Sequence, residues 1–293
     1  MTELRTQARA KINLCLFVGP YREDGLHQVV TLMDSLDICD DVCLRITSGA
    51  QGMDEVVCPG VEGPNLAAAA LATFRARTGW DAPPVRLQIT KRVPVAAGMA
   101  GGSADAAAAL RLAAQAADID DPRLLEDIAG ELGADVPSQI RGGLVLATGE
   151  GTRLRPLPLA LDYSVVVLPV DAELAARDVY AEADRLGLPR DALGLARSLT
   201  RVQAAISSET VLEHVHNDLQ DAARSLCPAI DEALEAAINA GADTTLVSGS
   251  GPTVLAIFFE VGHRERAATA HATLVAEGRT PRPILAGPSR PTD

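Results

Sequence analysis

The chain has 293 residues, 47% of them hydrophobic, which suffices for one large domain or two ordinary ones. Its formal net charge of −13 argues against nonspecific nucleic-acid binding and against docking on anionic lipid. We find no signal peptide and no uncharged stretch long enough to span a membrane, so we expect a cytoplasmic protein without a membrane or nucleic-acid partner.

Apolar periodicity and turn residues predict strands and helices in mixed order. Strands are expected at Ala8–Val18, Val29–Leu36, Asp41–Thr47, Val85–Thr90, Gly142–Thr148, Tyr163–Leu168, Thr244–Val247 and Thr253–Phe259. Helices are expected at Asn65–Thr78, Ala104–Ala117, Pro122–Leu132, Ala175–Leu186, Leu193–Ile206, Leu219–Leu226, Ala229–Ala240 and Arg264–Glu277.

The mixture lacks strict β-α-β alternation, which favours an α+β protein in two lobes. Pro156-Leu157-Pro158 is typical of a domain joint, so the predicted domains cover residues 1–157 and 158–293. Gly133 to Pro137 is expected to break the helical pattern, and the proline-rich tail Pro281–Asp293 is expected to fray.

A glycine-rich stretch between a predicted strand and a predicted helix is the most informative motif. Glycine allows positive φ and close ligand approach, and the start of a helix attracts phosphate, so the motif predicts an anion site. It contains neither the Gly-Lys-Ser/Thr of a Walker A loop nor a Gly-x-Gly-x-x-Gly fingerprint, and Ser103 is expected to cap its helix or to touch phosphate or Mg²⁺. The stretch comprises Pro94, Val95, Ala96, Ala97, Gly98, Met99, Ala100, Gly101, Gly102, Ser103 and Ala104.

Three further features suit phosphoryl transfer, which needs cations near the phosphate and a carboxylate near the attacking hydroxyl. Lys11 and Lys91 are the only lysines in an arginine-rich chain, so each indicates a place that needs a compact ammonium. Asp135 is either a helix cap or turn residue, or a carboxylate held beside a substrate hydroxyl. The small-residue turn Ser248–Thr253 predicts close packing against another loop or a ligand.

The cysteines and histidines favour neither disulfides nor a metal site. The five cysteines are odd in number and form no Cys-x-x-Cys pair, which favours reduced, buried thiols. His214 and His216 are two residues apart, a spacing that points them away from each other on a helix, so no protein metal site is expected.

The order of these motifs resembles the GHMP kinase superfamily. The resemblance rests on Ala10-Lys11-Ile12-Asn13-Leu14, Asp24-Gly25-Leu26-His27, Pro64-Asn65-Leu66, the stretch from Pro94 to Ala108, Gly133-Ala134-Asp135-Val136-Pro137 and Ser248 to Thr253. It covers nearly the whole chain. Within the superfamily it is closest to kinases that phosphorylate the 2-hydroxyl of the methylerythritol unit of a cytidine diphosphate sugar alcohol, in non-mevalonate isoprenoid biosynthesis.

The resemblance implies an N-terminal ribosomal-S5-like lobe and a C-terminal ferredoxin-like lobe, with ATP and a small-molecule substrate between them. It implies that Lys11 and Asp135 are the catalytic pair. It also implies that the stretch from Pro94 to Ala104, with Asn65, binds ATP, whose phosphates Mg²⁺ bridges. The implied substrate-binding residues are Asn13, Leu26, His27 and Tyr180, with His27 reading the cytosine edge.

Two departures from the family pattern keep alternatives open. Leu26 stands where the family usually has tyrosine, and Ser138-Gln139 stand where an aromatic usually follows. A second hypothesis is therefore a GHMP-type kinase for another alcohol, such as homoserine, a sugar or a secondary-metabolite precursor. A third is a nucleotide-binding module without catalysis, which the joint presence of Lys11 and Asp135 disfavours.

Overall fold

The computed structural model describes residues 2–23, 25–46, 52–95 and 97–289. Its contacts group into two compact units, each assembled from several stretches of chain. The first unit comprises Met1–Ala10, Ile38–Val95 and Ala100–Gly142; the second comprises Lys11–Asp37, Ala96–Met99 and Gly143–Asp293. The domain boundary expected near residue 157 stays a prediction, and the two units are described separately.

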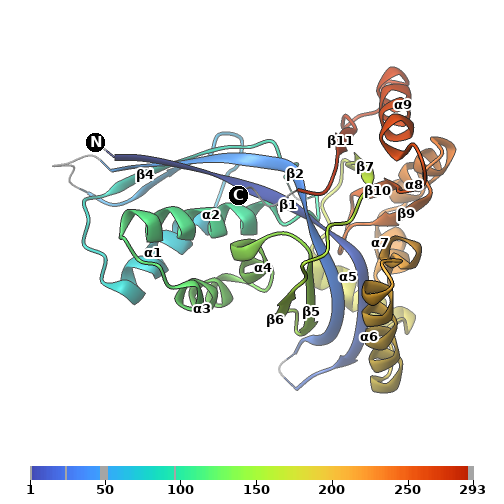
Figure 1. Cartoon of the computed structure of the whole chain (residues 1–293), viewed down its shortest axis with the longest axis horizontal. Helices are drawn as coiled ribbons and strands as arrows, with labels where there is room; N and C mark the ends of the chain where they lie inside the picture. The colour runs from blue at the N-terminus through green and yellow to red at the C-terminus, as the bar shows by residue number, and fades with distance from the viewer. Residues whose placement is uncertain (1, 24, 47–51, 96, 290–293) are drawn as a thin grey trace. The chain divides into compact units, whose positions relative to one another are not determined.

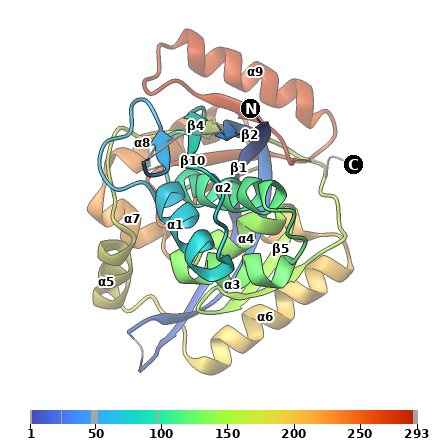
Figure 2. The ribbon, with the colours of Figure 1, turned by 90° about the vertical axis from the view of Figure 1, so that its left-hand side faces the viewer.

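In the first unit, helices gather beside short paired strands (Figure 2). The C-terminal part of β2 (His27–Ile46) pairs antiparallel with β4 (Val85–Thr90), with Asp41 opposite Thr90, and β3 (Glu55–Val57) runs parallel to β4. The helices are α1 (Leu66–Thr78), α2 (Gly101–Ala116), α3 (Pro122–Leu132) and α4 (Val136–Arg141).

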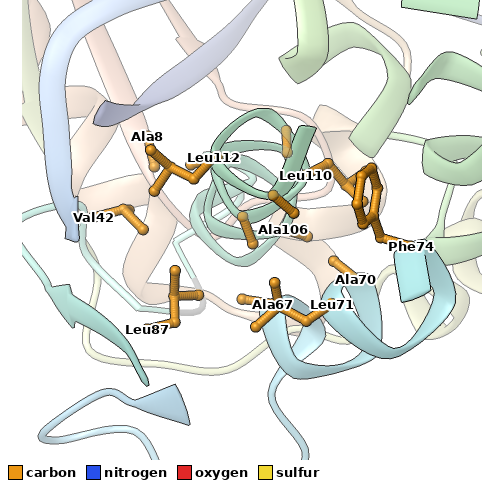
Figure 3. Close-up of a cluster of buried hydrophobic side chains, with 14 of the residues drawn as sticks. Ala8, Val42, Ala67, Ala70, Leu71, Phe74, Leu87, Ala106, Leu110 and Leu112 are labelled. Atoms are coloured by element: carbon orange, nitrogen blue, oxygen red, sulfur yellow. The ribbon is translucent and has the colours of Figure 1, made fainter. Parts of the chain in front are cut away.

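The core of the first unit is built around the alanine face of α2 (Figure 3). Ala106 and Leu110 lie in α2, Ala67 and Phe74 in α1, and Leu87 in β4; all five side chains are fully buried. Alanine has almost no side chain, so α1 can approach α2 closely, and the larger Phe74 and Leu110 fill the remaining volume. The packing fixes α2, whose first residues belong to the glycine-rich stretch.

The second unit contains a four-stranded antiparallel sheet in the order β11–β7–β10–β9. Helices α8 and α9 pack on it, and Figure 1 shows them beside these strands. The strands of this sheet are β7 (Ser164–Leu168), β9 (Thr244–Val247), β10 (Val254–Phe258) and β11 (Ile284–Ala286). The helices of this unit are α5 (Ala176–Leu186), α6 (Ala192–Ser207), the 3₁₀ turn η1 (Val211–His214), α7 (Gln220–Leu226), α8 (Ala229–Asn239) and α9 (His263–Ala276).

The second unit also contains the C-terminal part of β1 (Thr2–Tyr21) and the N-terminal part of β2. β1 pairs parallel with β8 (His216–Asn217), while β2 pairs antiparallel with β5 (Val145–Gly149), which in turn pairs with β6 (Arg153–Pro156). Lys11 and Asn13 lie on this part of β1.

Three expectations are corrected. β2 is one strand rather than two, because the carboxylate of Asp40 accepts backbone hydrogen bonds from Arg92 and Val93, at 2.5 and 2.8 Å, and so is satisfied inside the strand. The tail is not frayed over Ile284–Ala286, which pairs with β7.

The third correction concerns Val136 and Pro137, which lie in α4 (Val136–Arg141) although a break in the helical pattern was expected there. Pro137 lies in the first turn of this helix, where a missing N–H costs nothing. The helix therefore begins at Val136, and the break is confined to residues 133–135.

Candidate functional site

Lys11 is anchored by a chain of hydrogen bonds within the second unit. Its ammonium Nζ donates to Oδ1 of Asn13 at 2.7 Å, and Nδ2 of Asn13 donates to Oγ1 of Thr31 at 2.7 Å. Thr31 in turn donates to the carbonyl of Cys15 at 2.7 Å. Because an ammonium only donates, it fixes the orientation of the Asn13 amide. Lys11 and Asn13 are both buried, so the strand delivers one positive charge at a defined place.

The middle of the glycine-rich stretch lies against this pair. The backbone N–H of Lys11 donates to the carbonyl of Met99 at 3.1 Å. Gly98 has φ +65°, and a Cβ there would lie 2.7 Å from the carbonyl oxygen of Ser248 and 2.8 Å from that of Gly251. Only glycine fits this position. The expectation that the turn from Ser248 to Thr253 packs against another loop is confirmed.

Gly249 lies close to the lysine. A Cβ at Gly249 would lie 3.2 Å from Oδ1 of Asn13 and 3.8 Å from Nζ of Lys11. The turn is held by Asn217, whose Nδ2 donates to the carbonyls of Val247 and Gly249, both at 2.8 Å. Sequence reasoning missed Asn217, because neither its burial nor its partners 30 and 32 residues away are visible in the sequence.

The end of the glycine-rich stretch is already helix, so the expected cap at Ser103 is wrong. α2 begins at Gly101, and Ala100 occupies the N-cap position with a left-handed φ of 53°. Ser103 therefore lies in the first turn, where backbone N–H groups have no partner within their own helix. A Cβ on Gly102 would meet nothing within 4 Å, so the backbone there is open to a ligand.

A second lysine site lies in the first unit. Nζ of Lys91 donates to Oδ2 of Asp40 at 2.5 Å and to Oδ2 of Asp105 at 2.8 Å. A Cβ on Gly101, the first residue of α2, would lie 3.3 Å from the same nitrogen. The sequence pointed to Lys91 only through its rarity, and the two carboxylates were missed because they lie 51 and 14 residues away.

Burial and pairing compete in this cluster. Burial raises the pKa of Asp105 to about 6, although the hydrogen bond from Lys91 lowers it. Burial lowers the pKa of Lys91, but its hydrogen bonds to Asp105 and Asp40 outweigh this effect and raise the pKa above its ordinary value. Oδ1 of Asp105 is buried without a hydrogen-bond partner among the described residues.

Asp135 and Asn65 occupy the starts of two helices in the first unit. Asp135 is the N-cap residue of α4, but its side chain makes no capping hydrogen bond within the described chain, so capping does not explain the carboxylate. Asn65 does cap α1, by accepting from the N–H of Ala67 at 2.9 Å. Asp135 and Lys11 belong to different units, and their pairing stays a prediction, as does nucleotide binding by Asn65.

The expected base-binding residues cluster in the second unit. The His27 ring is buried and stacks on Tyr180, with ring centroids 5.6 Å apart and an interplanar angle of 23°. Its Nδ1–H donates to the carbonyl of Gly19 at 2.9 Å, and Nε2 lies 3.3 Å from Oδ2 of Asp184. Leu26 is 52% exposed beside this cluster. Contact of these residues with a substrate stays a prediction.

Other expectations have plainer outcomes. Ala96, part of the predicted phosphate loop, lies outside the described residues. His216 pairs with Asp218 at 2.6 Å, and its ring stacks on Phe17. Across the described ranges, no cluster of three or more His, Cys, Asp or Glu side chains has the arrangement of a metal site, and no helix is long and apolar enough to span a membrane.

Family models and curated relatives match most of the chain. The model for the GHMP kinases N terminal domain matches residues 65–143, and that for the GHMP kinases C terminal domain matches residues 193–276. A 4-diphosphocytidyl-2-C-methyl-D-erythritol kinase of Anaeromyxobacter dehalogenans strain 2CP-C is 40% identical over 94% of this chain and 86% of the relative. A relative of the same name in Thermobifida fusca is 36% identical over 96% of this chain and 97% of its own.

Solved structures also resemble nearly the whole chain. A crystal structure of 4-(cytidine 5′-diphospho)-2C-methyl-D-erythritol kinase has a TM-score of 0.76 and 30% identity, covering 97% of this chain and 98% of its own. A homoserine kinase from Cytophaga hutchinsonii has a TM-score of 0.73 at 17% identity, over 98% of this chain and 95% of its own, which shows a shared fold alone. The predicted α+β GHMP kinase fold, with its N- and C-terminal domains, is confirmed, and the chain belongs to the GHMP kinase family.

Proposed function

We propose that this chain transfers the γ-phosphoryl group of ATP to the 2-hydroxyl of 4-diphosphocytidyl-2-C-methyl-D-erythritol, as a step of the non-mevalonate route to isoprenoid precursors. The observation that carries the proposal is the buried pair of Lys11 and Asn13, whose polar side-chain atoms lie close to the two glycine turns at Gly98 and Gly249. Relatives named for this activity, which match nearly the whole chain, support the choice of substrate.

In the proposed reaction, Asp135 accepts the proton of the 2-hydroxyl as that oxygen attacks the γ-phosphorus. The bond between the γ-phosphorus and the bridging oxygen breaks, and ADP leaves. Lys11 stabilises the negative charge that develops on the transferred group, and Asn13 holds Lys11 in place. A carboxylate acting as general base contributes about 10²- to 10⁴-fold to the rate.

The backbone at the start of α2 is proposed to bind the ATP phosphates. Gly102 is open to a ligand, and the first N–H groups of a helix attract anions. Mg²⁺ fits this arrangement, since it binds mainly phosphate oxygens and water, and Ser103 offers a hydroxyl near the helix start. When bound, Mg²⁺ neutralises phosphate charge.

A kinase for another alcohol is the second candidate, and the exposed aliphatic side chain of Leu26 favours it because leucine offers no aromatic face to a base.

The five cysteines are all free thiols, which supports the proposed cytoplasmic location.

A substrate panel tests the proposal. The protein is incubated with Mg-ATP and, separately, with the cytidine diphosphate substrate, homoserine and simple sugars, and products are identified by mass. We expect phosphorylation of the cytidine diphosphate substrate alone. Phosphorylation of another alcohol alone supports the second candidate, whereas ATP binding without turnover of any acceptor supports a binding module without catalysis.

A further inference from the structure

Tyr21 places an exposed aromatic ring next to His27. Its ring centroid lies 5.1 Å from that of His27, with an interplanar angle of 70°, so the rings meet edge to face. Tyr21 ends β1 and is 65% exposed. The ring therefore presents a large apolar surface to solvent beside His27.

The turn that follows holds Tyr21 in position. The N–H of Arg22 donates to the carbonyl of Leu26 at 2.8 Å, and the N–H of Gly25 donates to the carbonyl of Arg22 at 3.2 Å. A Cβ on Gly25 would lie 3.6 Å from the hydroxyl of Tyr21, so the tyrosine side chain lies along the turn rather than away from it. The ring therefore lies at the end of β1, beside the described residues of the turn.

The neighbouring side chains offer less to a planar ligand. Tyr180 already stacks one face on His27 and is only half-buried against it, and His27 is itself buried. Leu26, the exposed apolar side chain of the same turn, has no ring. Tyr21 is therefore the member of this ring cluster with the most exposed aromatic surface.

We propose that Tyr21 is a specificity-determining residue, whose ring stacks on the pyrimidine of a nucleoside diphosphate substrate beside His27. This inference rests on the proposed function, because it assigns a residue to the base of that substrate. Base stacking on an aromatic side chain is worth roughly 1–3 kcal/mol per base, which is about 5- to 150-fold in affinity.

Three variants test the inference. Tyr21→Leu keeps apolar volume but removes the ring, Tyr21→Phe keeps the ring, and Val261→Ala trims an exposed apolar side chain elsewhere in the same unit. For each, calorimetry gives the Kd of the cytidine diphosphate substrate without ATP, and steady-state kinetics gives the KM of both substrates and kcat.

We expect Tyr21→Leu to raise the Kd and KM of the cytidine diphosphate substrate at least fivefold. The KM of ATP and the thermal midpoint should stay unchanged, and Tyr21→Phe and Val261→Ala should match the wild type within twofold. If the wild type phosphorylates this substrate and Tyr21→Leu binds it equally well, the inference alone is overturned. If the wild type neither binds nor phosphorylates it, the proposed function fails, and the inference fails with it.

Discussion

The ammonium of Lys11 is held 2.7 Å from Oδ1 of Asn13, and the same amide donates to Thr31 at 2.7 Å. Asn13 thus links the ammonium of Lys11, on β1, to Thr31, which lies on β2. An amide satisfies both partners, since its oxygen accepts from the lysine while its nitrogen donates to the threonine. Asn13 therefore helps to determine where the ammonium of Lys11 lies.

Replacing Asn13 with alanine should lower kcat more than it raises the KM of ATP. The variant removes an acceptor of a buried ammonium and so weakens its positioning, at a cost to the free energy of unfolding of about 1–3 kcal/mol. We expect a fall in kcat of roughly tenfold or more, measured by steady-state kinetics. Asn239→Ala, at an exposed helix end, is the control, and a wild-type kcat in Asn13→Ala would contradict the assigned role.

Gly98→Ala should destabilise the protein. The new Cβ would meet two carbonyl oxygens at 2.7 and 2.8 Å, and alanine disfavours the φ of +65°. The combined strain and overpacking should cost roughly 2–4 kcal/mol in the free energy of unfolding, measured with urea. An unchanged midpoint would show that the two turns do not pack as described.

Gly102→Ala is the matched comparison for Gly98→Ala, since the same substitution should not destabilise the protein at this position. Its Cβ would meet nothing within 4 Å and the residue is helical, so the free energy of unfolding should stay level or rise by about 0.5–1 kcal/mol. If ATP phosphates approach this backbone, the added methyl group should raise the KM of ATP severalfold while leaving the KM of the alcohol unchanged. An unaltered KM for ATP would remove Gly102 from the proposed phosphate site.

Lys91→Met should be strongly destabilising, because it leaves the buried carboxylates of Asp40 and Asp105 without their shared cation. Removing one partner of a buried ion pair costs roughly 3–5 kcal/mol. The double variant Lys91→Met/Asp105→Asn should recover part of that loss, since it removes one of the two unpaired charges. Urea unfolding of both variants measures the effect, and equal stability of Lys91→Met and wild type would contradict it.

Asp34 should make stability depend on pH. Its carboxylate accepts a hydrogen bond from Tyr163 at 2.9 Å, but burial raises its pKa to about 6. The folded pKa lies above the unfolded value of about 3.9, so the stabilisation from the bound proton is complete below pH of about 4 and is lost as pH rises through about 6. Above that range, the ionised carboxylate costs about 3 kcal/mol relative to low pH.

Asp34→Asn cannot ionise, so it should become more stable relative to the wild type as pH rises from about 4 to about 7. Urea unfolding at both pH values gives the difference, and Asp171→Asn, at an exposed site, is the control. A difference between Asp34→Asn and wild type that does not change with pH would show that Asp34 does not titrate in this range.

The sequence was most informative where chemistry is local. Most helices and strands lie close to their predicted ranges because apolar periodicity and capping residues such as Asn65 act within a few residues. It failed where the partner is distant: β11 is a strand only because β7 lies beside it, and Asp40 lies within a strand only because the backbone of residues 92 and 93 satisfies it.

The same distinction holds for the candidate site. Glycine content marked the region of Gly98, and the rarity of lysine marked Lys11, but neither reveals that Gly98 fits against the carbonyls of Ser248 and Gly251. The start of α2 was misplaced because no side-chain cap signals it; Ala100 enters the left-handed region instead. A left-handed alanine leaves no compositional trace, because most alanines avoid this region.

The rate of phosphoryl transfer by Asp135→Asn tests the central claim most directly. The variant, the wild type and the exposed control Asp127→Asn are each incubated with Mg-ATP and 4-diphosphocytidyl-2-C-methyl-D-erythritol, and the phosphorylated product is quantified over time. We predict product formation by the wild type and the control, and a fall in kcat of at least about 10²-fold in Asp135→Asn. Turnover by Asp135→Asn at the wild-type rate would contradict the proposed mechanism.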